Sequence, residues 1–128
     1  MPSVREVMSK DLVTVDRSAT VEEASTVMWA RHVGSALVMR GEELEGIFTE
    51  RDIMKALSKN ADRGRTMTVR EFMTQEPQTI EADATVGEAL DVMLTKGFRH
   101  LPVKDGGALA GIVSMTDLVQ ATAKQPTD

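Results

Sequence analysis

The sequence repeats itself once at a fixed offset, and this repeat limits the possible folds more than any other feature. Val4-Arg-Glu-Val-Met8 recurs as Val69-Arg-Glu-Phe-Met73, and Gly46-Ile47 recurs as Gly111-Ile112, in both cases 65 residues later. The register holds without a gap from residue 4 to about residue 121. Such a repeat marks a duplicated structural unit. A unit of about 60 residues is marginally stable alone, so we expect the two repeats to share a core.

Each repeat predicts the element order β-α-β-β-α. A short helical turn is expected first, at 3–9 and at 68–74. In repeat 1 there follow an extended piece at Thr14-Val15, a helix from Thr20, two strands that turn at Gly41, and a helix over 52–59. In repeat 2 we expect the extended piece at 79–80, the first helix from Thr85, the two strands around a turn at 105–107, and the closing helix over 117–124. Threonine followed three residues later by Glu23 or Glu88 fits a capping box at both helix starts.

The fold class that follows is α/β, with two tandem β-α-β-β-α repeats packed as one pseudo-two-fold module. We expect repeat 1 over 1–60, a polar and basic linker over 61–68, and repeat 2 over 69–128. The chain of 128 residues has an ordinary globular balance, with 41% hydrophobic and 27% charged residues.

The first long helix of repeat 1 is predicted to bury one apolar face, made of Val21, Ala24, Val27 and Met28. Trp29 falls outside this face, and its counterpart in repeat 2 is Leu94. Large apolar side chains at equivalent off-face positions indicate a surface that something else buries. Our hypothesis is a homodimer with Trp29 and Leu94 at or near the contact.

Both repeats contain the stretch Gly-apolar-apolar-Thr/Ser-x-x-Asp, at 46–52 and at 111–117, and repeat 2 contains Phe98-Arg-His-Leu-Pro-Val103. With the β-α-β-β-α order, these stretches resemble a tandem pair of CBS domains, a Bateman module, over about Ser3 to Ala123. The resemblance implies a stand-alone regulatory module that binds AMP, ADP, ATP or S-adenosylmethionine in clefts between the repeats. It further implies a homodimer that transmits ligand occupancy to an unknown protein partner, with no cofactor required.

Two pairs of residues are candidates for ligand chemistry on their own account: Thr49 with Asp52, and Ser114 with Asp117. Each pair lies where a predicted strand runs into a helix, and a helix N-terminus favours phosphate. The hydroxyl can donate to a phosphate oxygen, and the carboxylate can accept from ribose hydroxyls. The same Ser/Thr-x-x-Asp pattern also fits a capping box, so a purely structural role stays open.

The resemblance adds further candidate ligand-binding residues. It implies that Arg99 and His100 point toward ligand phosphates, and that Thr116 lies with them near the start of the closing helix. It also implies that the adenine pocket is lined by Thr14-Val15 and by Thr79-Ile80. Repeat 1 has Gly34-Ser35 in place of Arg99-His100, so we expect two unequal sites.

Several function classes are disfavoured by composition. The chain has no cysteine and no His-x-x-x-His or P-loop motif, so we predict neither an enzyme nor a metal protein. A net charge of −5 and only 3% aromatic residues disfavour nucleic-acid binding. No apolar run approaches a membrane span of roughly 20 residues, and the N-terminus lacks a signal-peptide core, so the expected location is the cytoplasm. The alternative function is a dimeric scaffold that binds a protein without any ligand.

Overall fold

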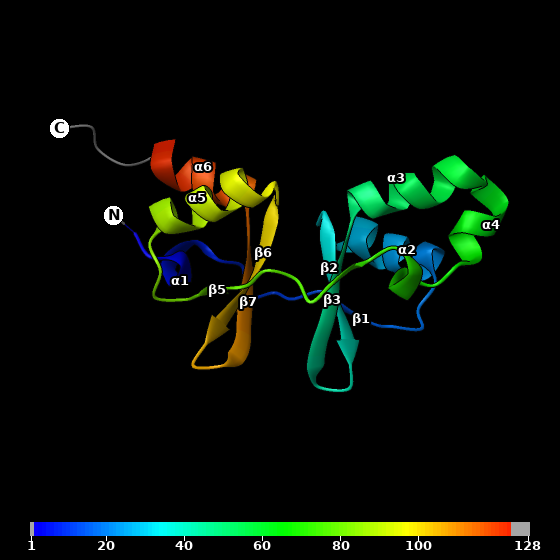
Figure 1. Cartoon of the computed structure of the whole chain (residues 1–128), viewed down its shortest axis with the longest axis horizontal. Coiled ribbons are helices and arrows are strands. Elements are labelled where there is room, and N and C mark those ends of the chain that lie inside the picture. Colours follow the sequence, from blue (N-terminus) through cyan, green and yellow to red (C-terminus); the bar gives the residue numbers. More distant parts are fainter. Residues whose placement is uncertain (1, 124–128) are drawn as a thin grey trace. The chain divides into compact units, whose positions relative to one another are not determined.

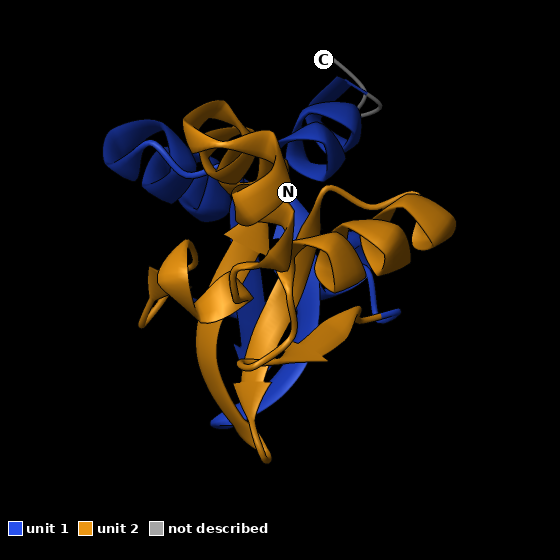
Figure 2. Ribbon diagram, turned by 90° about the vertical axis from the view of Figure 1, so that its right-hand side faces the viewer, with its two compact units in different colours: residues 1–11, 78–128 blue, residues 12–77 orange. Residues whose placement is uncertain are grey.

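The computed structural model describes residues 2–123, which form two compact units (Figure 2). Unit 1 combines the N-terminal residues up to 11 with the chain from residue 78 onward, and unit 2 comprises residues 12–77. The units therefore do not follow the sequence repeats: the first residues of repeat 1 belong to the unit that contains most of repeat 2.

Unit 2 is built on a four-stranded sheet in the order β1-β2-β3-β4 (Figure 1). Its first two strands are parallel, and the other neighbours are antiparallel. The elements are β1 (Thr14–Asp16), α2 (Val21–Arg31), β2 (Ser35–Arg40), β3 (Glu43–Thr49), α3 (Glu50–Lys59), α4 (Ala61–Thr66), the 3₁₀ helix η1 (Val69–Glu71) and β4 (Thr74–Gln75).

Unit 1 has a three-stranded sheet in the order β5-β6-β7, with β5 parallel to β6 and β6 antiparallel to β7. Its elements are α1 (Val4–Val7), β5 (Ile80–Glu81), α5 (Val86–Lys96), β6 (His100–Asp105), β7 (Ala108–Ser114) and α6 (Met115–Ala123). The α/β class and the β-α-β-β-α order predicted for each repeat are confirmed. The predicted end of the last helix, Lys124, lies outside the described residues.

The segment expected as a linker is largely helical, because it contains α4. The Asn60 side chain caps this helix by accepting a hydrogen bond from the Arg63 backbone N–H at 3.0 Å. Gly64 lets α4 approach α3 closely, since a Cβ there would overlap the carbonyl oxygen of Ala56.

The first residues of the chain are fixed to unit 1 by backbone hydrogen bonds. The N–H of Val4 donates to the Ala84 carbonyl at 2.8 Å, and Ser9 and Ile112 exchange a pair of bonds at 2.8 and 3.0 Å. In unit 2 the equivalent residue Val69 donates to the Ala19 carbonyl at 2.8 Å. Each repeat thus contributes its opening turn to the compact unit of the other repeat.

These crossing segments explain the glycine that begins the repeated Gly-apolar-apolar stretch. A Cβ on Gly46 would lie 2.5 Å from the Met73 sulfur, and one on Gly111 would lie 2.6 Å from the Met8 sulfur. Real Cβ atoms do not approach so closely, so only glycine leaves room for the crossing methionine.

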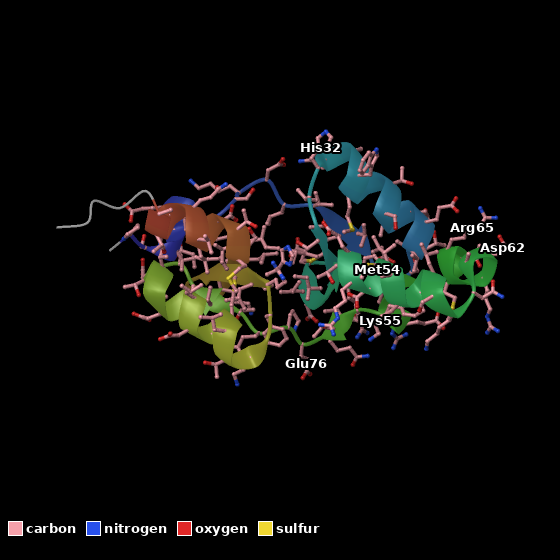
Figure 3. All side chains as sticks on the ribbon, turned by 90° about the horizontal axis from the view of Figure 1, so that it is seen from above. His32, Met54, Lys55, Asp62, Arg65 and Glu76 are labelled. Atoms are coloured by element: carbon pink, nitrogen blue, oxygen red, sulfur yellow. The ribbon has the colours of Figure 1, made fainter. Side chains whose placement is uncertain are left out.

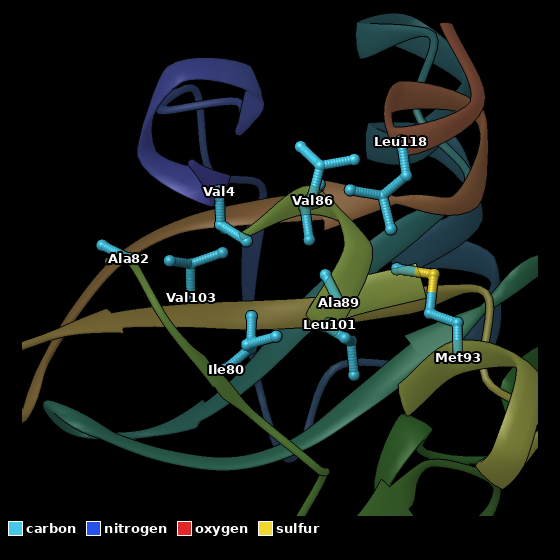
Figure 4. Close-up of a cluster of buried hydrophobic side chains, with 10 residues drawn as sticks. Val4, Ile80, Ala82, Val86, Ala89, Met93, Leu101, Val103 and Leu118 are labelled. Atoms are coloured by element: carbon cyan, nitrogen blue, oxygen red, sulfur yellow. The ribbon is translucent and has the colours of Figure 1, made fainter. Parts of the chain in front are cut away.

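The core of unit 1 gathers between its helices and its sheet (Figure 4). In unit 2, Val21, Ala24 and Met28 are buried as predicted, but Val27 is 38% exposed, so its place in the buried face was wrong. With about 100° per residue, Val27 lies roughly 90° from the centre of that face, where the neighbouring elements no longer cover it.

Candidate functional site

In unit 2 the candidate residues lie at the junction where β3 runs directly into α3. Thr49 is the last residue of β3 and the N-cap of α3. Its backbone N–H donates to Asp52 Oδ2 at 2.9 Å, and its hydroxyl lies 3.4 Å from the same oxygen. Asp52 is buried, with 7% of its surface exposed. The junction therefore holds a carboxylate away from solvent at the first turn of a helix.

Unit 1 repeats this arrangement where β7 runs into α6. The Ser114 N–H donates to Asp117 Oδ2 at 2.9 Å, and the Asp117 N–H donates to Ser114 Oγ at 3.1 Å. This reciprocal pair is a capping box, so both aspartates do take part in capping as the structural alternative requires. The hydrogen bonds that the described residues make to the two carboxylates end on Oδ2. In these contacts Oδ1 of each carboxylate takes no part in the cap.

The electrostatics of Asp52 are set by burial. Loss of solvent raises the pKa of the Asp52 carboxyl, and the Thr49 N–H offsets part of this rise. The exposed cap residue Glu23 accepts the Thr20 N–H at 3.0 Å, and these Thr20 hydrogen bonds lower the pKa of Glu23. The same capping contact thus occurs in two different environments.

The first residues of β2 and β6, and the residues just before them, lie beside these junctions. In unit 1, His100 pairs with Ser114 across β6 and β7, and the Arg99 carbonyl accepts the Met115 N–H at 2.8 Å. The structure therefore brings Arg99 and His100 next to Ser114 and the start of α6. The corresponding place in unit 2 is occupied by Gly34 and Ser35, with the Glu50 N–H donating to the Gly34 carbonyl at 3.1 Å and Ser35 pairing with Thr49.

The candidates for the adenine pocket lie further along each sheet. Thr14 is exposed and Val15 half-buried on β1, where Thr14 pairs with Leu37, two residues along β2 from Ser35. Thr79 is half-buried immediately before β5. Ile80 is 8% exposed and belongs to the core cluster of unit 1, so its side chain contributes mainly to packing.

Thr116 lies exposed on the first turn of α6, one residue before Asp117. Asp117 also borders a hollow of about 200 Å³, together with Val7, Gln120 and Ala121.

A larger groove, of about 610 Å³, lies in unit 2 and was not predicted from the sequence. It is lined by Ser25, Met28, Trp29, His32, Val33, Gly34, Glu50 and Ile53. A signal for it exists in the repeat alignment, because Ser25 and Gly34 stand where repeat 2 has Leu90 and Arg99.

Two further observations concern the described part of the chain. Between residues 2 and 123, no group of three or more His, Asp or Glu side chains is placed to hold a metal ion. Within the same residues, no helix has both the length and the apolar character needed to cross a membrane.

Comparison with known proteins gives one consistent result. A family model described as the CBS domain matches residues 4–59 and 69–124. An uncharacterized 17.7 kDa protein of Acidianus ambivalens is 38% identical over 92% of this chain and 71% of its own length.

Solved structures agree over most of the chain. The CBS-domain containing protein ATU1752 from Agrobacterium tumefaciens superimposes with a TM-score of 0.89 at 30% identity, covering 94% of this chain and 99% of that one. The CBS domain pair of protein MJ0100, solved with 5′-methylthioadenosine and S-adenosyl-L-methionine, gives a TM-score of 0.86 at 25% identity, with 96% and 97% coverage.

Proposed function

The chain belongs to the CBS-domain family, and we propose that it is a regulatory module that binds an adenosine-containing ligand at its strand-to-helix junctions and passes this occupancy to a protein partner. The observation that carries the proposal is the pair of matching junctions, Thr49 with Asp52 and Ser114 with Asp117. In each junction a hydroxyl and a helix N-terminus lie beside a carboxylate, and one oxygen of that carboxylate takes no part in the cap.

The proposed contacts follow from the chemistry of a nucleoside. Ribose hydroxyls donate to Oδ1 of Asp52 or Asp117, while the Thr49 or Ser114 hydroxyl and the helix N–H groups face the phosphate of a nucleotide. The ligands of the MJ0100 domain pair, both adenosine derivatives, support this ligand class.

The two sites are proposed to be unequal. Arg99 stands beside Ser114 in unit 1, where a guanidinium can bind phosphate oxygens, while unit 2 has Gly34 at the equivalent position. We therefore propose that a phosphorylated ligand is held more tightly in unit 1.

Calorimetry and thermal unfolding with AMP, ADP, ATP and S-adenosylmethionine test the proposal, with GMP as the base control. A ligand at 100 times its dissociation constant should stabilise the fold by about 2.7 kcal/mol. Neither heat nor stabilisation from any adenosine compound would favour the alternative function, a dimeric scaffold without ligand.

The scaffold alternative and the proposed homodimer rest on exposed apolar side chains. Trp29 is 80% and Leu94 67% exposed, as predicted for residues outside the buried helix face, and Met54 and Val119 are 66% and 51% exposed. These are two repeat-equivalent pairs, one on α2 and α5 and one on α3 and α6. We propose that a second copy of the chain covers them, which sedimentation of the wild type and of Trp29→Glu tests.

A further inference from the structure

Unit 1 shows how the arginine of the repeated Val-Arg-Glu segment binds an anion. Arg5 Nη1 donates to Asp105 Oδ2 at 2.7 Å, and Arg5 Nη2 donates to Asp105 Oδ1 at 3.1 Å, so the guanidinium holds this carboxylate as a fork. The same Nη2 also donates to Asp83 Oδ1 at 2.9 Å. The arginine at this place in unit 1 is therefore matched by two carboxylates of its own unit.

Unit 2 keeps this arginine but lacks both carboxylates. The counterpart of Arg5 is Arg70, and the positions of the two aspartates are held by Ser18 and Arg40. The backbone around them is the same in both units. The opening turn makes the equivalent backbone hydrogen bond at 2.8 Å, and β2 pairs with β3 in the same register, with the same bulge, as β6 with β7. A carboxylate that the arginine binds in unit 1 is thus replaced in unit 2 by a second arginine.

A third arginine lies at the same end of the unit 2 sheet. The Arg17 N–H donates to the Met39 carbonyl at 3.2 Å, which places Arg17 beside the end of β2. Arg17 Nη1 lies 3.2 Å from Glu45 Oε2, and Arg70 Nε lies 3.8 Å from Glu45 Oε1. Within residues 2–123, the Arg40 side chain makes no hydrogen bond or ion pair. Three arginines at this end of the sheet therefore have one ion-paired carboxylate between them.

We propose that this arginine cluster, defined as Arg17, Arg40 and Arg70, binds a phosphate group at the place that the Asp105 carboxylate fills in unit 1. Arginine forks bind carboxylate and phosphate oxygens alike. A phosphate group presents three acceptor oxygens and so can serve several guanidinium groups at once. The cluster lies at the hairpin end of β2 and β3, whereas the junction of the proposed nucleotide site lies at the other end, at Thr49. It is therefore a second anion site, independent of the nucleotide proposal.

Acidic residues near the cluster compete with a bound anion. Glu43 pairs with Arg40 across β2 and β3, and Glu42 lies in the turn between these strands. Neither glutamate side chain makes an ion pair within the described part of the chain. Asp16, at the end of β1, accepts the Ser18 N–H at 2.9 Å. Because Glu43 is the direct neighbour of Arg40, Glu43→Gln should strengthen phosphate binding by about two- to fivefold.

Giving unit 2 the aspartate of unit 1 provides the test. In Arg40→Asp the new carboxylate should be held by Arg70, as Arg5 holds Asp105, so the place of the phosphate is filled from within the chain. The probe is inorganic phosphate at about pH 8 and constant ionic strength, followed by the NMR signals of the arginine Nε–H groups. Phosphate should shift the signals of the three cluster arginines in the wild type, and Arg40→Asp should weaken its binding by at least about tenfold. Arg70→Gln is a second variant with the same expected loss, and circular dichroism confirms that each variant is folded.

Two control variants separate the cluster from general charge and from the nucleotide site. Arg63→Asp makes the same change in net charge as Arg40→Asp. Arg63 is exposed on α4, the helix that carries the labelled Asp62 and Arg65 in Figure 3. This control should leave phosphate affinity within about twofold of the wild type, because solvent and salt screen a distant charge. Arg99→Gly, which removes the proposed nucleotide phosphate contact in unit 1, should leave the phosphate-induced shifts of the cluster unchanged. Glycerol 3-phosphate is a second probe: binding equal to that of inorganic phosphate assigns the site to phosphate monoesters as well as to the free ion.

The outcomes decide between a phosphate site and a network of surface ion pairs. Shifts of the cluster signals that are lost in Arg40→Asp and enlarged in Glu43→Gln support the site. The proposal is overturned if phosphate up to about 20 mM shifts none of these signals, or if acetate shifts them equally. It is also overturned if Arg40→Asp binds phosphate as the wild type does, since the arginines then serve only to pair with Glu43 and Glu45. None of these results bears on nucleotide binding, which is measured separately with adenosine compounds.

Discussion

Replacing Asp52 with asparagine separates the two roles of this side chain, the helix cap and the proposed ligand contact. The cap needs only an oxygen that accepts the Thr49 N–H, now bonded at 2.9 Å, and the asparagine amide supplies one. The ligand contact needs a charged acceptor, and a hydrogen bond to a charged group contributes about 1.5–3 kcal/mol. We therefore expect Asp52→Asn to weaken nucleotide binding at this junction by roughly 10- to 150-fold.

The stability of Asp52→Asn, unlike its affinity for nucleotide, should not fall. Burial raises the pKa of Asp52, so the folded protein holds a proton at this site more readily than the unfolded chain does. Its contribution to stability is therefore greatest below the pKa of the unfolded chain and is lost as the pH rises through the folded pKa. At pH 7 the asparagine variant, which has no charge to bury, should be at least as stable as the wild type. The difference should shrink as the pH is lowered and the wild-type carboxyl becomes neutral.

The assay combines calorimetry at pH 7 with urea unfolding from about pH 4 to about pH 8. Asp52→Ala, which also removes the cap, should lose about 1 kcal/mol of stability. Glu23→Gln is the matched control, because Glu23 makes the same kind of cap on α2 without a proposed ligand role. If Asp52→Asn binds nucleotide as tightly as the wild type, the Asp52 carboxylate serves only as a helix cap. One that is less stable at pH 7 would refute the burial argument.

Three further predictions concern the close contacts and the inequality of the sites. Gly64→Ala should lower the free energy of unfolding by about 3 kcal/mol in urea, because its Cβ meets the Ala56 backbone, which no side-chain rotation relieves. Gly111→Ala should lower the free energy of unfolding by about 2 kcal/mol. Adding Met8→Ala should restore only part of this loss, because it removes the methionine sulfur but not the backbone oxygen that lies 2.8 Å from the new Cβ. Arg99→Gly should weaken AMP binding about tenfold and leave adenosine binding unchanged in calorimetry, and an equal loss for both ligands would contradict a phosphate contact.

Much of the fold was predictable because the repeat aligns local signals twice. The Thr20 and Glu23 cap forms as expected, with reciprocal hydrogen bonds of 3.0 and 3.1 Å. The two strand-to-helix junctions also lie where the sequence predicted them, since a strand pattern ending at Thr49 or Ser114 is followed at once by a helical one.

The exchange of the opening turns was not predictable from local pattern. Residues 4–6 and 69–71 have the same sequence, Val-Arg-Glu, so neither segment carries a preference for its own repeat. Tertiary contacts decide which unit each opening turn joins. One of them is the hydrogen bond from Arg5 Nη1 to Asp105 Oδ2 at 2.7 Å. The equivalent residues of the other repeat are Arg70 and Arg40, two cations that cannot form this ion pair. The same limit applies to α4, whose basic composition is typical of a loop and whose helix depends on the glycine contact with α3.

The groove of unit 2 was missed for a related reason. Ser25 and Gly34 are unremarkable in their own segments, and they produce a hollow only because two helices and a loop converge on them. Comparing the repeats position by position would have found it, because Leu90 and Arg99 fill the equivalent places. Differences between the repeats therefore carry information about binding that their shared pattern does not.

The contrast between Glu23 and Asp52 bears most directly on whether the junctions are more than caps. Both carboxylates accept the N–H of a threonine three residues earlier, at 3.0 and 2.9 Å. At the exposed Glu23 these hydrogen bonds lower the pKa, so the charged cap is stabilising. At Asp52 burial outweighs them and raises the pKa, so keeping the charge there opposes folding at neutral pH. A cap alone gives no reason to bury the carboxylate, since Glu23 caps its helix from solvent. Binding a polar ligand group through Oδ1 does give one, because a hydrogen bond to a charge strengthens as water is excluded.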